Sequence, residues 1–114
     1  MKPQELRIGN LIEQGEIEMI SNTAVWINEK PLLIDEIEPI PLTEESLLKF
    51  GFVYDGWSYI KGKYKFHAQS KNNKGGFENT EFYVKECLIS FNVDFVHQLQ
   101  NLYFALTNEE LKIT

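Results

Sequence analysis

The sequence predicts an α+β fold: a small antiparallel sheet or partly closed barrel with two main helices, the C-terminal one packed on the sheet. Three observations support this prediction. Short apolar stretches separated by turn residues fill the first third of the chain, as is typical of antiparallel strands. Residues 43–52 carry helix signals at both ends, and residues 93–106 place apolar side chains at helical spacing.

Residues 1–38 are the strand-rich N-terminal part. We expect turns at Gln14-Gly15 and at residues 28–31, because Gly, Asn and Pro favour turn conformations. The strands on either side are short and apolar. A connector follows, in which Pro39 and Pro41 exclude regular helix and make a central strand unfavourable.

The connector and a short helix make up residues 39–52. Thr43 is a good N-cap for the helix, and acidic residues follow it in the first turn, where the helix dipole favours negative charge. Gly51 suits the left-handed residue that ends a helix. Phe52 then stands where it can pack back onto Leu47.

A hairpin and a strand are predicted for residues 53–92. Lys61-Gly62 is a plausible hairpin turn, and residues 71–76, KNNKGG, form a mobile loop by composition. Residues 82–91 are predicted to form one long strand. The alternation in KYKFHA places three side chains on one strand face: Lys63, Lys65 and His67.

The C-terminal helix is predicted over residues 93–106, with Asp94 as its N-cap. Thr107 and Glu110 have the spacing of a capping box, which predicts a further short turn. One wide helix face collects the apolar residues Phe95, Val96, Leu99, Leu102, Tyr103 and Leu106.

The opposite helix face carries an uncharged stripe at positions i, i+3, i+4 and i+7. Its members are His97, Gln100, Asn101 and Phe104. A solvated helix face usually carries Lys and Glu, whereas no charge stands here between Asp94 and Glu109 when His97 is neutral. This composition indicates a helix covered on both sides, by the chain itself or by another protein.

Length and charge limit the classes of function. A chain of 114 residues suits a single domain, and its net charge of −6 argues against general nucleic-acid binding. Residues 56–77 nevertheless contain five lysines and no acid. No apolar run approaches the roughly 20 residues of a membrane span, and no signal peptide is visible, so we expect a cytoplasmic protein without membrane contact.

Catalytic and metal-binding patterns are missing from the sequence. Two histidines and one cysteine show no ligand spacing, so we expect no metal and no cofactor. We interpret Cys87 as a buried strand residue, because free cysteine often behaves as a small hydrophobe. The paired acids are explained by helix starts and a solvated connector. We therefore predict that the protein is not an enzyme.

A basic and aromatic patch is a second candidate site. It comprises Trp57, Tyr59, Lys61, Lys63, Lys65 and His67. Lysines beside aromatic rings can hold single-stranded nucleic acid by charge and stacking. Lysines on an edge hairpin also protect it from aggregation. An acidic protein, or the acidic remainder of this chain, is a further partner for the patch.

Three stretches resemble a family of short conserved hypothetical proteins from gut bacteria and their phages or mobile elements. They are LRIGN near the start, PIPLTEESLLKFGF in the centre and HQLQNLYFALTNEEL near the end. The chain departs from the family pattern at Ser46, where a large aromatic is typical, and at Asn108, where Gly is typical. The family has no established activity, so the resemblance implies no catalytic residue.

The favoured hypothesis is a small non-enzymatic accessory protein of phage or mobile-element origin that binds a protein or itself. The uncharged stripe of the C-terminal helix motivates this hypothesis. One alternative is single-stranded nucleic-acid binding through residues 57–67. Another is an enzyme whose site is assembled from dispersed residues.

Overall fold

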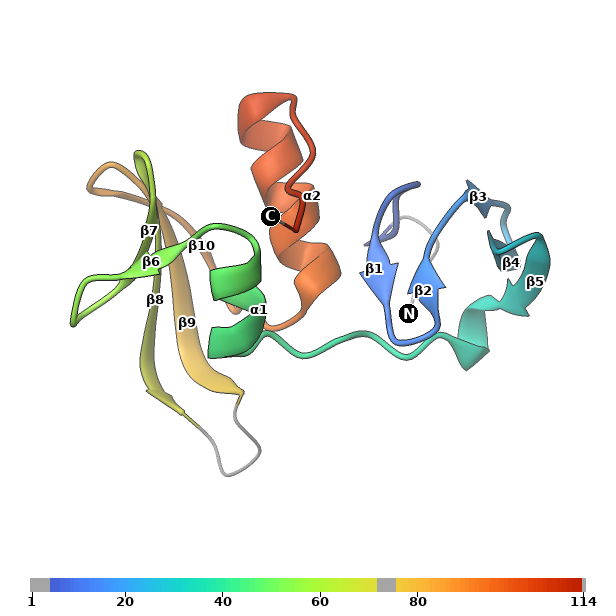
Figure 1. Ribbon diagram of the computed structural model, residues 1–114, viewed down its shortest axis with the longest axis horizontal. Coiled ribbons are helices and arrows are strands. Elements are labelled where there is room, and N and C mark those ends of the chain that lie inside the picture. Colours follow the sequence, from blue (N-terminus) through green and yellow to red (C-terminus); the bar gives the residue numbers. More distant parts are fainter. Residues whose placement is uncertain (1–4, 72–75, 114) are drawn as a thin grey trace. The chain divides into compact units, whose positions relative to one another are not determined.

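The computed structural model describes residues 5–71 and 76–113, and its contacts gather into two compact units (Figure 1). The first unit comprises residues 1–40 and 95–111, and the second comprises residues 41–94 and 112–114. The predicted α+β class is confirmed, with two α-helices and small antiparallel sheets. Among the described residues the strands form open sheets and close no barrel.

Short antiparallel strands build the first unit, as the turn pattern predicted. In the turn after β4, Asn28 and Glu29 both adopt positive φ, of 51° and 67°. One sheet pairs β1 with β2, and another has the order β3-β4-β5. The elements are β1 (Leu11–Ile12), β2 (Gly15–Glu16), β3 (Met19–Ile20), β4 (Ala24–Ile27), β5 (Lys30–Leu33) and the 3-10 helix η2 (Ile34–Glu36).

Helix α2 (Val96–Thr107) belongs to the first unit, where it packs against β1. The predicted N-cap is wrong: Phe95 occupies that position, and the Gln98 side chain accepts its backbone N–H at 3.1 Å. The helix ends at Asn108, whose φ of 59° is left-handed. Asparagine tolerates this conformation better than most residues with a side chain, so it can end the helix.

The predicted capping box at Thr107 does not form. Its hydroxyl donates to the carbonyl of Tyr103 at 2.8 Å and accepts the N–H of Glu109 at 3.0 Å. Glu110 instead pairs with Arg7. The expected further helical turn is therefore missing after Asn108 in the described residues.

A five-stranded antiparallel sheet forms most of the second unit, with the order β10-β9-β8-β7-β6 (Figure 1). The long strand predicted over residues 82–91 is wrong, because a two-residue turn at Lys85 and Glu86 breaks it into a hairpin. Residues 72–75 of the predicted mobile loop lie outside the described residues. The strands are β6 (Val53–Tyr54), β7 (Tyr59–Lys61), β8 (Tyr64–Lys71), β9 (Phe77–Val84) and β10 (Cys87–Phe91).

Helix α1 (Glu44–Lys49) has both of its predicted ends. The Thr43 hydroxyl accepts the N–H of Ser46 at 3.3 Å, and the Ser46 hydroxyl accepts the N–H of Thr43 at 2.8 Å. Gly51 has a φ of 91°, and the N–H of Phe52 donates to the carbonyl of Leu47 at 3.1 Å. This is the glycine-terminated helix end expected from the sequence.

Each unit buries hydrophobic side chains. A cluster of aliphatic side chains fills the first, and it contains Leu6, Ile12, Ile17, Val25, Ile27, Ile34 and Ile37. The second unit buries larger, mainly aromatic side chains: Leu47, Phe50, Phe52, Tyr59, Phe66 and Phe82. Cross-strand pairing places Tyr59, Phe66 and Phe82 side by side on one sheet face.

Candidate interaction surface

The uncharged stripe of α2 is covered by the N-terminal segment of its own unit. The Gln100 side chain accepts the N–H of Leu11 at 2.8 Å and donates to the carbonyl of Gly9 at 3.3 Å. Asn101 donates to the carbonyl of Glu5 at 2.9 Å. These bonds satisfy the amide groups that a buried helix face cannot leave unpaired. The cover that the sequence indicated is therefore supplied within the chain.

Arg7 is the centre of this cover, and sequence reasoning did not identify it. Its guanidinium lies 4.2 Å from the centre of the Phe104 ring, which is a cation–π contact. It donates to Asn101 Oδ1 at 2.9 Å and to Glu110 Oε1 at 2.5 Å. Asn10 reaches the same Asn101 oxygen at 2.8 Å. Residues 5–11, which include the motif LRIGN, thus provide these partners of the stripe.

His97 is the titratable member of the stripe, and only 2% of its surface is exposed. Its ring stacks on Phe95, with the ring centres 6.0 Å apart, and its Nδ1 has no hydrogen-bond partner among the described residues. Burial lowers the pKa of His97, and the negative charge of Glu5 opposes that shift in part. Burial therefore favours the neutral form of the His97 ring, which packs inside the unit.

The predicted basic and aromatic patch is divided between two faces of the sheet. Tyr59 and Lys61 lie on the face of Phe66, where Tyr59 is buried. Lys65 and His67 lie on the opposite face. Strand alternation separates these four residues. The remaining two, Trp57 and Lys63, lie in turns, and Trp57 stacks on His67 with ring centres 5.0 Å apart.

The face that carries Lys65 and His67 collects exposed apolar side chains; we call it the open face. Direct cross-strand pairs run from Val53 through Ile60, Lys65 and Tyr83 to Leu88, across all five strands. A second row joins His67, Glu81 and Phe91. Four apolar side chains of this face are exposed: Val53 at 66%, Trp57 at 73%, Leu88 at 41% and Phe91 at 61%.

Trp57 is held in place although it is the most exposed of these side chains. The Asp55 carboxylate accepts the N–H of Trp57 at 2.8 Å and the N–H of Ser58 at 2.7 Å. Both hydrogen bonds lower the pKa of Asp55, and the bond from Ser58 has the larger effect. His67 adds the ring stack and a hydrogen-bond contact with the Trp57 carbonyl at 3.1 Å. The indole is thus presented on an ordered turn.

Two charged residues of the cross-strand rows, Lys65 and Glu81, lie on either side of Tyr83. The ammonium of Lys65 is 5.5 Å from the centre of the Tyr83 ring. Desolvation, and then the negative charge of Glu81, raise the pKa of Tyr83. Neither charged side chain forms an ion pair within residues 5–71 and 76–113.

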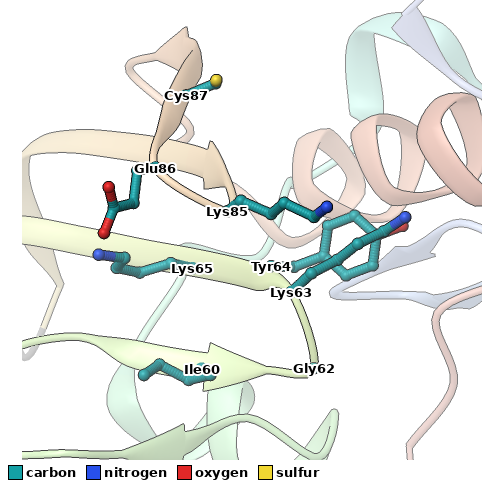
Figure 2. A pocket seen from close by; sticks show the side chains of 8 residues that line it. All are labelled: Ile60, Gly62, Lys63, Tyr64, Lys65, Lys85, Glu86 and Cys87. Carbon is teal, nitrogen blue, oxygen red and sulfur yellow. The ribbon is translucent and has the colours of Figure 1, made fainter.

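Two hairpin ends enclose a shallow pocket of about 600 Å³ (Figure 2). The N–H of Lys85 donates to the carbonyl of Lys63 at 2.6 Å and so joins the two turns. Figure 2 shows Lys63 and Lys85 extending beside Tyr64, whereas Lys65 points toward Glu86. The pocket therefore has a basic side and a mixed side.

Cys87 also lines this pocket, and the prediction that it is buried is wrong. It is exposed because β10 is an edge strand and Cys87 directly follows the hairpin turn. No group of three metal-binding side chains occurs in the described part of the chain. Over those same residues, no helix has the length and apolar character needed to cross a membrane.

Several residues of the open face were missed at the sequence level. Glu81 and Tyr83 alternate with the buried Phe82, a signal that was present in FENTEFYV. Phe91 gave no such signal. A register shift between Leu88 and Ser90 places Phe91 opposite Glu81, and bulges of this kind cannot be located from alternation alone.

Comparison with known proteins identifies no relative of this chain. The chain matches no protein-family model, no curated protein and no solved structure. Its function is therefore argued from the geometry of its own residues.

Proposed function

We propose that this chain is a non-enzymatic protein-interaction module that binds through the open face of its five-stranded sheet. The observation that carries the proposal is the exposure of four apolar side chains, Val53, Trp57, Leu88 and Phe91, on one face of the sheet. Contiguous exposed apolar surface marks interaction sites in folded proteins. Aromatic residues are enriched in protein interfaces, and Trp57 and Phe91 are two of these four exposed side chains.

The open face replaces the α2 stripe as the binding surface. The amide side chains of the stripe already have partners in Arg7, Gly9 and Leu11, so they need no second protein. The resemblance to short proteins of phages and mobile elements places the module, in this proposal, among cytoplasmic accessory proteins. Such proteins act by contact with another polypeptide rather than by catalysis.

Site-specific photo-cross-linking tests the proposal. A photoreactive amino acid replaces Phe91 on the open face, and in a second variant it replaces Leu33, which is also exposed but lies on β5 of the first unit. Both variants are irradiated in cells of the source organism. We expect a discrete cross-linked protein from position 91 and none from position 33.

A charge on the open face provides the specificity control. Adding Val53→Glu to the position-91 variant should remove the adduct, because a carboxylate then stands within the apolar contact. Circular dichroism verifies that the doubly substituted chain remains folded. Equal labelling from positions 91 and 33, or no labelling from position 91, would contradict the proposal.

Single-stranded nucleic-acid binding is a second candidate function, favoured by one observation. Trp57 presents an exposed indole on an ordered turn, with Lys65 on the same sheet face. Base stacking on such a ring contributes about 1–3 kcal/mol per base. The net charge of −6 opposes this function at long range.

Fluorescence anisotropy with labelled oligonucleotides at low salt tests this candidate. If it is correct, binding weakens about tenfold or more in Trp57→Ala, which corresponds to the loss of one stacked base. It also weakens when Lys61, Lys63 and Lys65 are all replaced by Ser. An unchanged anisotropy with the unsubstituted protein at low salt eliminates the candidate.

A further inference from the structure

We infer that a second pocket, lined by aromatic rings, binds a methylated ammonium group. This aromatic pocket has a volume of about 180 Å³, and none of the described side chains that line it carries a charge. Its rings belong to Tyr54, Trp57, Tyr59 and Phe77. The inference goes beyond the proposed function and does not depend on it, because the pocket is a separate site for a small chemical group.

The strands place most of the aromatic pocket on the sheet face opposite the open face. Tyr54 pairs with Tyr59, and Tyr59 pairs with the buried Phe66. Ala68, which also lines the pocket, is two residues from Phe66 and shares its face. The ring centre of Phe77 is 5.8 Å from that of Tyr59 and 5.3 Å from that of Phe66. All of these residues belong to the second unit.

The rings border the aromatic pocket in different orientations. The ring of Tyr54 is inclined by 38° to that of Tyr59, with the ring centres 4.8 Å apart, and the ring of Phe77 meets Tyr59 at 63°. Tyr59 is buried, whereas Tyr54 and Trp57 are 49% and 73% exposed. The pocket therefore has a buried aromatic side chain at its base and accessible ones at its rim.

Such a set of rings selects a cation with little hydration. The face of an aromatic ring carries negative electrostatic potential, and cages of several rings bind quaternary ammonium groups and methylated lysine. An unmodified ammonium is strongly hydrated, and an uncharged pocket does not replace its hydrogen bonds to water. Methyl groups remove those N–H donors. The volume equals that of about six water molecules in the liquid, which suits one trimethylammonium group.

Asp55 supplies a negative charge beside the aromatic pocket. It stands next to Tyr54 in the chain, and its carboxylate accepts the backbone N–H of Trp57 at 2.8 Å. Lys65 attracts the same carboxylate, but its cross-strand partner Ile60 places it on the open face. At longer range, the net charge of −6 also favours a cationic ligand over an anionic one.

Titration with choline, followed by Trp57 fluorescence in a Trp26→Phe background, tests the inference. The neutral analogue of choline, in which a carbon atom replaces the nitrogen, has the same shape without the charge. It should bind about tenfold or more weakly. Tyr54→Ala should weaken choline binding by about tenfold or more, and Tyr54→Phe should retain most of it. Phe91→Ala removes an exposed ring outside the pocket and should have no effect.

Circular dichroism establishes that each variant is folded, and calorimetry records binding that leaves the fluorescence unchanged. Equal affinity for choline and its neutral analogue overturns the inference, as does equal weakening by Tyr54→Ala and Phe91→Ala. The absence of saturable binding by both measurements also overturns it. None of these results alters the cross-linking expected from position 91, so the proposed function is tested separately.

Peptides distinguish the two sources of a methylated ammonium group. A peptide with trimethyllysine that binds more tightly than choline supports the inference and assigns the group to a side chain of another protein. Choline that binds at least as tightly as that peptide supports it with a free small molecule as the ligand. A peptide with unmodified lysine that binds as tightly as the trimethylated one overturns the inference, because the pocket then does not select methyl groups.

Discussion

Arg7 connects four groups of the first unit through one guanidinium. It stacks on Phe104, bonds Asn101 and the carbonyl of Gln100, and pairs with Glu110. The residues that accept hydrogen bonds from Arg7 lie 93 to 103 positions further along the chain. A planar group with five fixed donors can serve all of them, which an ammonium cannot do.

Replacement of Arg7 tests this account. We expect Arg7→Ala to lower the free energy of unfolding of the first unit by about 2 kcal/mol, because hydrogen bonds to a charged group are lost. Arg7→Lys should recover less than half of that loss. Urea unfolding followed by Trp26 fluorescence in a Trp57→Phe background reports this unit. Lys30→Ala, an exposed cation of the same unit, should cost under about 0.5 kcal/mol.

His97 makes the first unit sensitive to acid. Its pKa is lowered in the folded state by burial, so the unfolded chain binds the proton more readily below pH 6.5. Stability is therefore full above pH 6.5 and falls as the pH drops toward the lowered folded-state pKa. Urea midpoints on either side of pH 6.5 should show this decrease, and His97→Leu should reduce it. An equal decrease in His97→Leu would assign the effect to other groups.

The uncharged stripe shows which structural features a sequence pattern can predict and which it cannot. The absence of charge between Asp94 and Glu109 correctly indicated a covered helix face. It did not identify the cover, because Arg7 and Asn10 have no local feature that marks them as partners of Asn101. A contact between residues about 90 positions apart depends on the whole fold. Side-chain composition predicts that a face is covered, but not what covers it.

Secondary-structure elements whose two ends both carry capping residues in the sequence were predicted most accurately. Helix α1 has its N-cap at Thr43 and its left-handed Gly51 as expected, because these residues act within a few positions of each other. The hairpin of β9 and β10 was missed for the opposite reason. Its turn uses Lys85 at a φ of 56°, where Gly or Asn is usual. The unfavourable residue gave no turn signal.

Lys85→Asn is expected to stabilise the second unit by about 0.5–1 kcal/mol. A side chain with Cβ is strained in the left-handed region, and asparagine tolerates that region better than lysine does. Thermal unfolding monitored by Trp57 in a Trp26→Phe background measures the change. Glu86→Asn, at the neighbouring turn position without a positive φ, is the control and should produce little change. Destabilisation by Lys85→Asn would show that the lysine side chain itself supports the turn.

Charge is divided unequally over the whole molecule. Residues of the first unit include ten acids and three bases, a net charge of −7, whereas those of the second include seven acids and eight bases, a net charge of +1. Self-repulsion within a strongly charged unit opposes its compact state. Overall composition hides this division, because the net charge of −6 belongs almost entirely to one unit.

Salt should therefore stabilise the two units differently. Raising the ionic strength to about 0.5 M shortens the range of repulsion to a few ångströms, which favours the acidic first unit. We expect its urea midpoint, followed by Trp26, to rise, while that of the second unit, followed by Trp57, stays nearly constant. A similar rise in both units would indicate a general salt effect on burial and not relief of repulsion.

The order of the units along the chain has a consequence for synthesis on the ribosome. The second unit is nearly continuous, since its sheet and α1 lie within residues 41–94. The first unit is interrupted by it and needs α2, which is translated after the sheet of the second unit. Its N-terminal strands therefore wait, with Arg7 lacking Glu110, while the whole sheet emerges from the exit tunnel. A chaperone that holds nascent polypeptides would have its longest opportunity on residues 5–40.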